Sequence, residues 1–228
     1  MADRVAKDAL FDAFAEVGRA LANGRRAEIV DVLAQGERSV DEVAGEIDQS
    51  MANTSQHLRA LARAGLVAAR RDGNRIYYRL ADDRVTALWA AMREVAADHV
   101  AGLDRLAAAY LGDRSEIASV TRDQLAGRLG TARSLVVLDI RPTPEFIAGH
   151  IPGARSVPPD EMGDRLKVLG RGSEAVAYCR GPYCAYADEA VRAMRRRGVR
   201  AFRLEDGFPE WRRAGLPVAS GAETEERV

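Results

Sequence analysis

Apolar residues in the first part of the chain recur at three- and four-residue intervals, which is the spacing of one helix face. The apolar positions of the first run are Leu10, Phe11, Phe14, Val17 and Leu21. Asn23-Gly24 closes this run. A second short helix is expected over residues 25–33, and Gly36 ends it.

Two further helices are indicated by serine residues at positions suited to helix capping. Ser39 precedes a helical run over residues 40–47, with Glu42 three residues after the cap, as in a capping box. Ser50 precedes another run, roughly over residues 51–64.

The apolar period then changes to that of short strands. Residues 66–71 and 74–80 read as two strands around Asp72-Gly73, which is a strong hairpin signal. One long helix is expected next, from Val85 to Leu111. Its apolar positions are Leu88, Met92, Val95, Val100, Leu103, Leu106 and Tyr110. The domain boundary is placed just after this helix.

The second half of the chain alternates between apolar runs and helical segments. Residues 135–138 and 175–178 are continuous apolar runs typical of buried parallel strands, and residues 200–204 suggest a third strand. A helix over residues 185–198 separates the last two. This order predicts an α/β domain with a parallel sheet.

Composition and charge refine this picture. The 228 residues suggest one large or two small domains, and 47% hydrophobic with 30% charged residues is typical of soluble proteins. The first residues resemble neither a signal peptide nor a membrane span, so we expect a cytoplasmic protein. Net charge is zero, yet residues 1–50 carry 6 basic against 11 acidic residues, whereas residues 51–80 carry 6 arginines and one acid. That basic segment suits a phosphate-facing surface.

Two helices joined by a tight turn and followed by a hairpin form a winged helix-turn-helix, whose second helix normally enters the major groove. In that helix Thr54, Leu58 and Leu61 are expected to pack inward. The opposite face carries side chains that read base edges or contact phosphate, and the hairpin tip adds more. The expected DNA-binding residues are Asn53, Ser55, Gln56, His57, Arg59, Arg63, Arg71, Asn74 and Arg75.

These segments resemble the ArsR (arsenic repressor) family of bacterial regulators. The resemblance rests on residues 20–26, 55–61, 64–67 and 73–80, in the family's order. It implies that residues 1–112 form a DNA-binding and dimerisation domain. It also implies a homodimer built on the first and last helices of that domain, a palindromic double-stranded operator, and repression relieved by a signal.

The chain departs from metal-sensing members of that family. The helix before the expected recognition helix contains no cysteine, and the last helix offers only Asp98-His99, whose neighbouring side chains point to different helix faces. We therefore expect no metal site in this domain and no cofactor.

The only two cysteines, Cys179 and Cys184, lie in one loop between an apolar run and a helix. An intracellular pair of this kind is more often catalytic, redox-active or metal-binding than structural. A helix N-terminus lowers the pKa of a nearby thiol, and loop amides can cradle an anion. This arrangement suits a cysteine that holds a sulfane sulfur as a persulfide.

A second resemblance covers about residues 115–219, and we assign residues 115–222 as a rhodanese-like domain. Residues 138–141, 145–146 and 149–154 resemble the first signature of that family, and residues 206–211 with 215–218 resemble the second. Cys179 falls at the family's nucleophile position, which implies sulfur transfer from thiosulfate or a low-molecular-weight persulfide. The expected site residues are Cys179, Cys184, Arg180, Asp139 and Arg141.

The cysteine loop also departs from its family. Cys184 stands where many sulfurtransferases carry a basic residue, and Pro182 removes one amide donor. Arg180 and Arg141 are candidates for the missing positive charge. Cys184 is also placed to attack a persulfide or sulfenate on Cys179 and leave a disulfide.

The chain is therefore interpreted as a transcriptional repressor. Its rhodanese-like half senses or processes reactive sulfur, an oxidant or a thiophilic oxyanion through Cys179. One alternative is a sulfurtransferase whose helix-turn-helix serves for dimerisation or targeting. Another is a repressor whose rhodanese-like domain only mediates contacts.

Overall fold

The computed structural model describes residues 3–130 and 135–222, and the chain divides into two compact units, residues 1–93 and 94–228. Each unit has its own buried apolar core. Within the described ranges, no helix combines the length and the apolar character needed to cross a bilayer.

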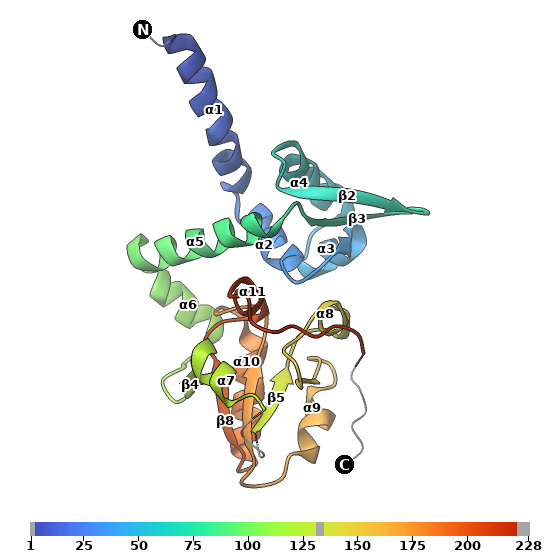
Figure 1. Ribbon diagram of the computed structural model, residues 1–228, viewed down its shortest axis with the longest axis vertical. Helices are drawn as coiled ribbons and strands as arrows, with labels where there is room; N and C mark the ends of the chain where they lie inside the picture. The colour runs from blue at the N-terminus through green and yellow to red at the C-terminus, as the bar shows by residue number, and fades with distance from the viewer. Residues whose placement is uncertain (1–2, 131–134, 223–228) are drawn as a thin grey trace. The chain divides into compact units, whose positions relative to one another are not determined.

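Four helices come first in the first unit (Figure 1), and their caps explain where they begin. They are α1 (Arg4–Leu21), α2 (Gly24–Leu33), α3 (Val40–Glu46) and α4 (Met51–Arg63). Asn23 caps α2, its side chain accepting from the Arg26 amide. Ser39 and Glu42 form the expected capping box at α3, and Ser50 caps α4 by accepting from the Asn53 amide.

The first unit also contains an antiparallel sheet in the order β1-β3-β2. We call its β2–β3 hairpin the wing. Its strands are β1 (Arg38–Ser39), β2 (Val67–Asp72) and β3 (Arg75–Leu80). Asp72 pairs with Arg75, so the two-residue turn is Gly73-Asn74 rather than Asp72-Gly73. Gly73 has a φ of 56°, which suits glycine at the first central position of such a turn.

The long helix expected from Val85 to Leu111 is wrong in one respect, because the structure breaks it in two. These are α5 (Asp83–His99), which crosses the boundary between the units, and α6 (Leu103–Leu111). Gly102 lies between them with a φ of 82°, a left-handed conformation that a continuous right-handed helix cannot contain.

The second unit is an α/β domain with a five-stranded sheet in the order β4-β8-β7-β5-β6, and all of its strand pairs are parallel. Its strands are β4 (Ser119–Val120), β5 (Leu135–Asp139), β6 (Arg155–Ser156), β7 (Glu174–Tyr178) and β8 (Arg200–Leu204). Besides α6, its helices are α7 (Arg122–Arg128), α8 (Thr143–Ala148), α9 (Met162–Arg165), the 3₁₀ helix η1 (Leu166–Val168), α10 (Ala185–Arg196) and α11 (Phe208–Arg213).

Both faces of this sheet are buried, because neighbouring residues of one strand belong to different cores. In β7, Ala175 and Ala177 pack in a cluster with the apolar face of α10. Val176 and Tyr178 pack in another cluster with residues of α7, α8 and α11, including Trp211. Strands covered on both faces read as continuous apolar runs, which is why the sequence revealed them.

Candidate functional site

Helix α4 separates a buried face from an exposed one. Thr54, Leu58 and Leu61 have 0% of their surface exposed, which confirms the inward face expected from the sequence. The expected DNA-reading residues lie elsewhere on the helix: Asn53, Gln56, Arg59 and Arg63 are exposed, and Ser55 and His57 are half-buried. The helix therefore presents amide and guanidinium groups of the kind that read bases or contact phosphate.

The arginines of the wing differ in the groups with which they interact. Arg71, Asn74 and Arg75 are exposed at the turn, where Arg71 Nε donates to the Gly73 carbonyl at 3.1 Å. A hydrogen bond with Tyr77 and the nearby Asp41 carboxylate raise the pKa of Arg75. Arg70, by contrast, pairs with Glu37 at 2.7 Å and with Asp72 at 3.0 Å.

The cysteine loop leaves the carboxyl end of β7 and enters the N-terminus of α10. Cys179 and Cys184 are joined by a disulfide, with their Cα atoms 6.2 Å apart. Cys179 is 2% exposed, whereas Cys184 is half-buried at the N-cap of α10. The two thiols expected to react with each other are thus placed within bonding reach.

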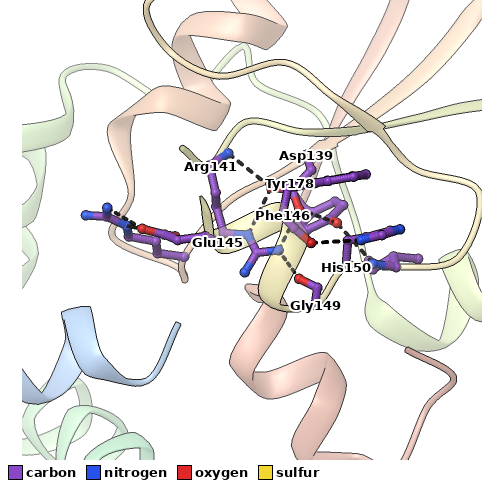
Figure 2. A network of polar contacts seen from close by, with 9 residues as sticks. Asp139, Arg141, Glu145, Phe146, Gly149, His150 and Tyr178 are labelled. Atoms are coloured by element: carbon purple, nitrogen blue, oxygen red, sulfur yellow. Dashed lines mark hydrogen bonds and ion pairs between the residues drawn. The ribbon is translucent and has the colours of Figure 1, made fainter. Parts of the chain in front are cut away.

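Asp139 and Arg141 form a buried pair at the carboxyl end of β5 (Figure 2). Arg141 Nη2 donates to Asp139 Oδ2 and to the Gly149 carbonyl, each at 2.6 Å, and the Arg141 side chain is 0% exposed. The Tyr178 hydroxyl donates to the same Asp139 oxygen at 2.6 Å and accepts from the Ile151 amide. This network holds β5, β7 and the loop after α8 together.

Burial raises the pKa of Tyr178 well above its ordinary value, and the Asp139 carboxylate raises it further. Tyr178 therefore stays a neutral hydrogen-bond donor at physiological pH.

The Arg180 guanidinium is also paired with a carboxylate inside the domain. Its Nε donates to Glu145 Oε1 at 3.0 Å, and the Glu145 side chain is 0% exposed. Both arginines named as candidates for donor binding therefore pair with carboxylates.

Sequence reasoning missed three polar residues behind the cysteine loop. Arg203 in β8 donates to the Pro182 carbonyl at 2.7 Å, and Arg114 donates to the same oxygen at 2.9 Å. Both also contact Asp188 in the first turn of α10. Parallel strands bring their carboxyl ends to one edge, so Arg203 near the end of its strand was a detectable signal.

Gly207 is a second missed position, although it stands in the quoted signature. A Cβ atom at this position would overlap the backbone of Arg180 and Gly181. The Phe208 amide also donates to the Cys179 carbonyl at 3.0 Å. The start of α11 therefore lies directly against the cysteine loop.

Within the residues that the structure describes, no three His, Cys, Asp or Glu side chains are grouped so that they could hold a metal ion.

Two family models match the chain. The model described as "Bacterial regulatory protein, arsR family" matches residues 23–69, which include α2, α3 and α4. The model described as "Rhodanese-like domain" matches residues 121–214, which include the cysteine loop.

Known proteins resemble the chain over its whole length or over its first unit. The HTH-type transcriptional regulator Rv0324 of Mycobacterium tuberculosis is 47% identical over 95% of this chain and 94% of its own. A probable mercury resistance operon repressor of Streptomyces lividans is 38% identical over 41% of this chain and 74% of its own. A solved homodimeric winged helix-turn-helix DNA-binding domain from Mycobacterium bovis is 48% identical over 44% of this chain and 91% of its own, with a TM-score of 0.41.

Proposed function

Because the chain belongs to the ArsR family of bacterial regulatory proteins and carries a C-terminal rhodanese-like domain, we propose that it is a repressor controlled by sulfur or redox chemistry at Cys179. The observation that carries this proposal is the bond between Cys179 and Cys184 in the loop where the rhodanese family has its nucleophile. A loop that cycles between a disulfide and two thiols is a switch.

Binding to operator DNA is supported by the exposed residues of α4 and of the wing. We propose that α4 enters the major groove, where Gln56 and Asn53 read adenine edges and Arg59 reads guanine or contacts phosphate. Arg71 and Arg75 at the wing tip contact the sugar-phosphate backbone or the minor groove.

A homodimer is supported by apolar side chains that are exposed to solvent in the single chain. In α1, Phe11 is 60% exposed and Phe14 is 63% exposed. In α5 and α6, Val95, Leu106 and Tyr110 are between 59% and 71% exposed. Such faces on the first and last helices of the DNA-binding region match the dimer contact that the family resemblance implies.

The proposed chemistry has two steps. The Cys179 thiolate attacks the outer sulfur of a low-molecular-weight persulfide, R–S–SH, which forms a Cys179 persulfide and releases R–S⁻. The Cys184 thiolate then attacks the Cys179 sulfur and expels HS⁻, leaving the disulfide. The two cysteines are oxidised, and the sulfane sulfur leaves reduced to sulfide.

Operator binding tests the proposal directly. DNA from upstream of the protein's own gene is titrated with the reduced protein, with and without glutathione persulfide, and with reduced glutathione as the matched control. We expect the persulfide to change the affinity of the wild type about fivefold or more, the lower range of typical allosteric coupling. Cys179→Ser and Cys184→Ser should not respond.

An equal response of the wild type and Cys179→Ser would contradict the proposal. No response of either would favour a rhodanese-like domain that only mediates contacts. A sulfurtransferase is the other candidate, favoured by the position of Cys179 in the loop that runs from the end of β7 to the N-terminus of α10. It predicts thiosulfate-to-cyanide turnover by the wild type together with no specific footprint on DNA.

A further inference from the structure

A polar cluster behind the cysteine loop ties that loop to the segment that leaves α6. We call it the Arg114 cluster; its members are Arg114, Asp188, Arg203 and the Pro182 carbonyl. Arg114 Nε donates to Asp188 Oδ2 at 2.5 Å, and its Nη1 donates to the carbonyl at 2.9 Å. Arg203 Nη2 donates to the same carbonyl at 2.7 Å, and its Nε lies 3.1 Å from Asp188 Oδ1.

The charges of the cluster make it depend on the loop. The Asp188 side chain is 0% exposed and the Arg203 side chain 9%, so one buried carboxylate faces two guanidinium groups. Burial, and then the nearby Arg114, lower the pKa of Arg203. Buried cations need acceptors, and the carbonyls of Gly181 and Pro182 supply them, at 3.3 and 2.7 Å from Arg203 Nη2.

The position of those carbonyls depends on the disulfide. Pro182 and Gly181 lie inside the ring that the bond between Cys179 and Cys184 closes. The Cys184 amide also donates to the Gly181 carbonyl at 3.2 Å. Cleaving the disulfide restores rotational freedom to the residues between the cysteines, so the acceptors are held less firmly.

On the other side, Arg114 belongs to the chain that joins α6 to β4. Its carbonyl accepts from the Ile117 amide at 2.9 Å. Just before it, the Asp113 side chain accepts from the Ser115 amide at 2.8 Å, and the Asp113 carbonyl accepts from Arg192 at 2.7 Å. An Arg114 side chain that loses the Pro182 carbonyl and keeps only Asp188 is held less firmly. The segment that contains Arg114 is then loosened as well.

We propose that Arg114 is a positioning residue that couples the redox state of the Cys179–Cys184 pair to the order of residues 112–117. This proposal rests on the proposed function, for which it supplies the first step of the route from the cysteine loop toward the DNA-binding unit. The disulfide form holds the segment. A dithiol reductant that delivers two electrons and two protons converts the disulfide to two thiols and loosens the segment.

Coupling is reciprocal, so loss of the Arg114 contact must also change the disulfide equilibrium. Full-length protein is equilibrated with mixtures of reduced and oxidised dithiothreitol, and the fraction of disulfide is measured by thiol alkylation. We expect Arg114→Gln to shift this equilibrium about fivefold or more toward the dithiol, at the lower end of typical coupling. Arg196→Gln, an exposed position on α10 outside the cluster, is the matched control and should not change it.

Hydrogen exchange of wild type gives a second test that needs no variant at Arg114. The Ile117 and Ser115 amides should exchange more slowly in the disulfide form than in the dithiol form. Equal exchange in the two forms, or an unchanged equilibrium in folded Arg114→Gln, would overturn the inference. A shift in Arg114→Gln while operator binding ignores the redox state would instead refute the proposed function and leave the coupling in place.

Discussion

At the scale of single residues, the cysteine loop depends on a position that has no side chain. Gly207 has a φ of −116°, which any residue adopts, so its requirement is purely one of space. A methyl group there would overlap the backbone of Arg180 and Gly181. A contact that close to main-chain atoms forces the loop or the start of α11 to move.

We therefore expect Gly207→Ala to lower the free energy of unfolding by about 1–3 kcal/mol, the usual cost of overpacking. Reduction of the Cys179–Cys184 disulfide should also become faster. Urea denaturation and the rate of reduction by dithiothreitol measure the two effects. Gly170→Ala is the control, because a Cβ there meets nothing within 4 Å. Equal stability of the two variants would show that the loop adapts without cost.

Tyr178 makes the stability of the second unit sensitive to alkaline pH. Its pKa in the folded protein lies well above the ordinary 10.0, mainly because the phenol is buried. The unfolded chain ionises near pH 10, so stability is fully present below that pH. It is lost as pH rises further, by up to about 1.4 kcal/mol per pH unit.

Tyr178→Phe should remove this dependence. Its free energy of unfolding should fall less steeply than that of the wild type between about pH 9.5 and pH 11. At neutral pH the variant should be less stable by about 1–3 kcal/mol, because Asp139 and the Ile151 amide lose a buried partner. Urea titrations across this pH range measure both effects, and Tyr183→Phe, at an exposed position, should keep the wild-type slope.

At the scale of elements, the wing separates arginines available to DNA from an arginine already paired. We expect Arg71→Gln to weaken binding to operator and to unrelated DNA equally, and to reduce the slope of log K against log salt by about 1. Arg70→Gln is the matched control one position away, since Arg70 pairs with Glu37 and Asp72. Affinity titrations at several salt concentrations measure this slope. Loss of specificity alone in Arg71→Gln would contradict a phosphate contact.

Elements whose signals lie close together along the chain could be predicted from sequence. Ser39 and Glu42 of the capping box are three positions apart, and the wing turn is defined by the residues around Gly73. The break at Gly102 was missed because apolar spacing continues through it. The two-residue strand β1 is too short to show any alternation.

In the candidate site, too, only the contacts between residues that are close in sequence were predictable. The cysteines and Arg180 are neighbours in one loop, so their placement together followed from sequence. Arg114 and Asp188, by contrast, are 74 positions apart, and their contact depends on how α10 and the chain after α6 pack. The direction of Arg141, toward Asp139 and away from solvent, depends likewise on the folded core.

At the scale of the whole molecule, the exposed apolar face of α1 predicts self-association. We expect the wild type to sediment as a dimer of the 24.8 kDa chain and Phe11→Ser/Phe14→Ser to sediment as a monomer with unchanged helix content. Burying each phenylalanine contributes about 1.5–3 kcal/mol. Val168→Ser, at a 76% exposed position of the second unit, should stay dimeric. A double variant that remains dimeric would show that the dimer contact does not depend on these two residues of α1.

The packing of α6 has a consequence for engineering hybrid regulators. Leu111 at the end of α6 is 5% exposed, and Arg192 of α10 donates to the carbonyls of Leu111 and Asp113. An exchange of DNA-reading halves at residues 112–115 would cut through these contacts. A graft made at residues 100–102, where the helix is already interrupted, keeps the contacts between α6 and α10. Chimaeras joined there should give each cysteine-loop half a new operator at little cost in folding.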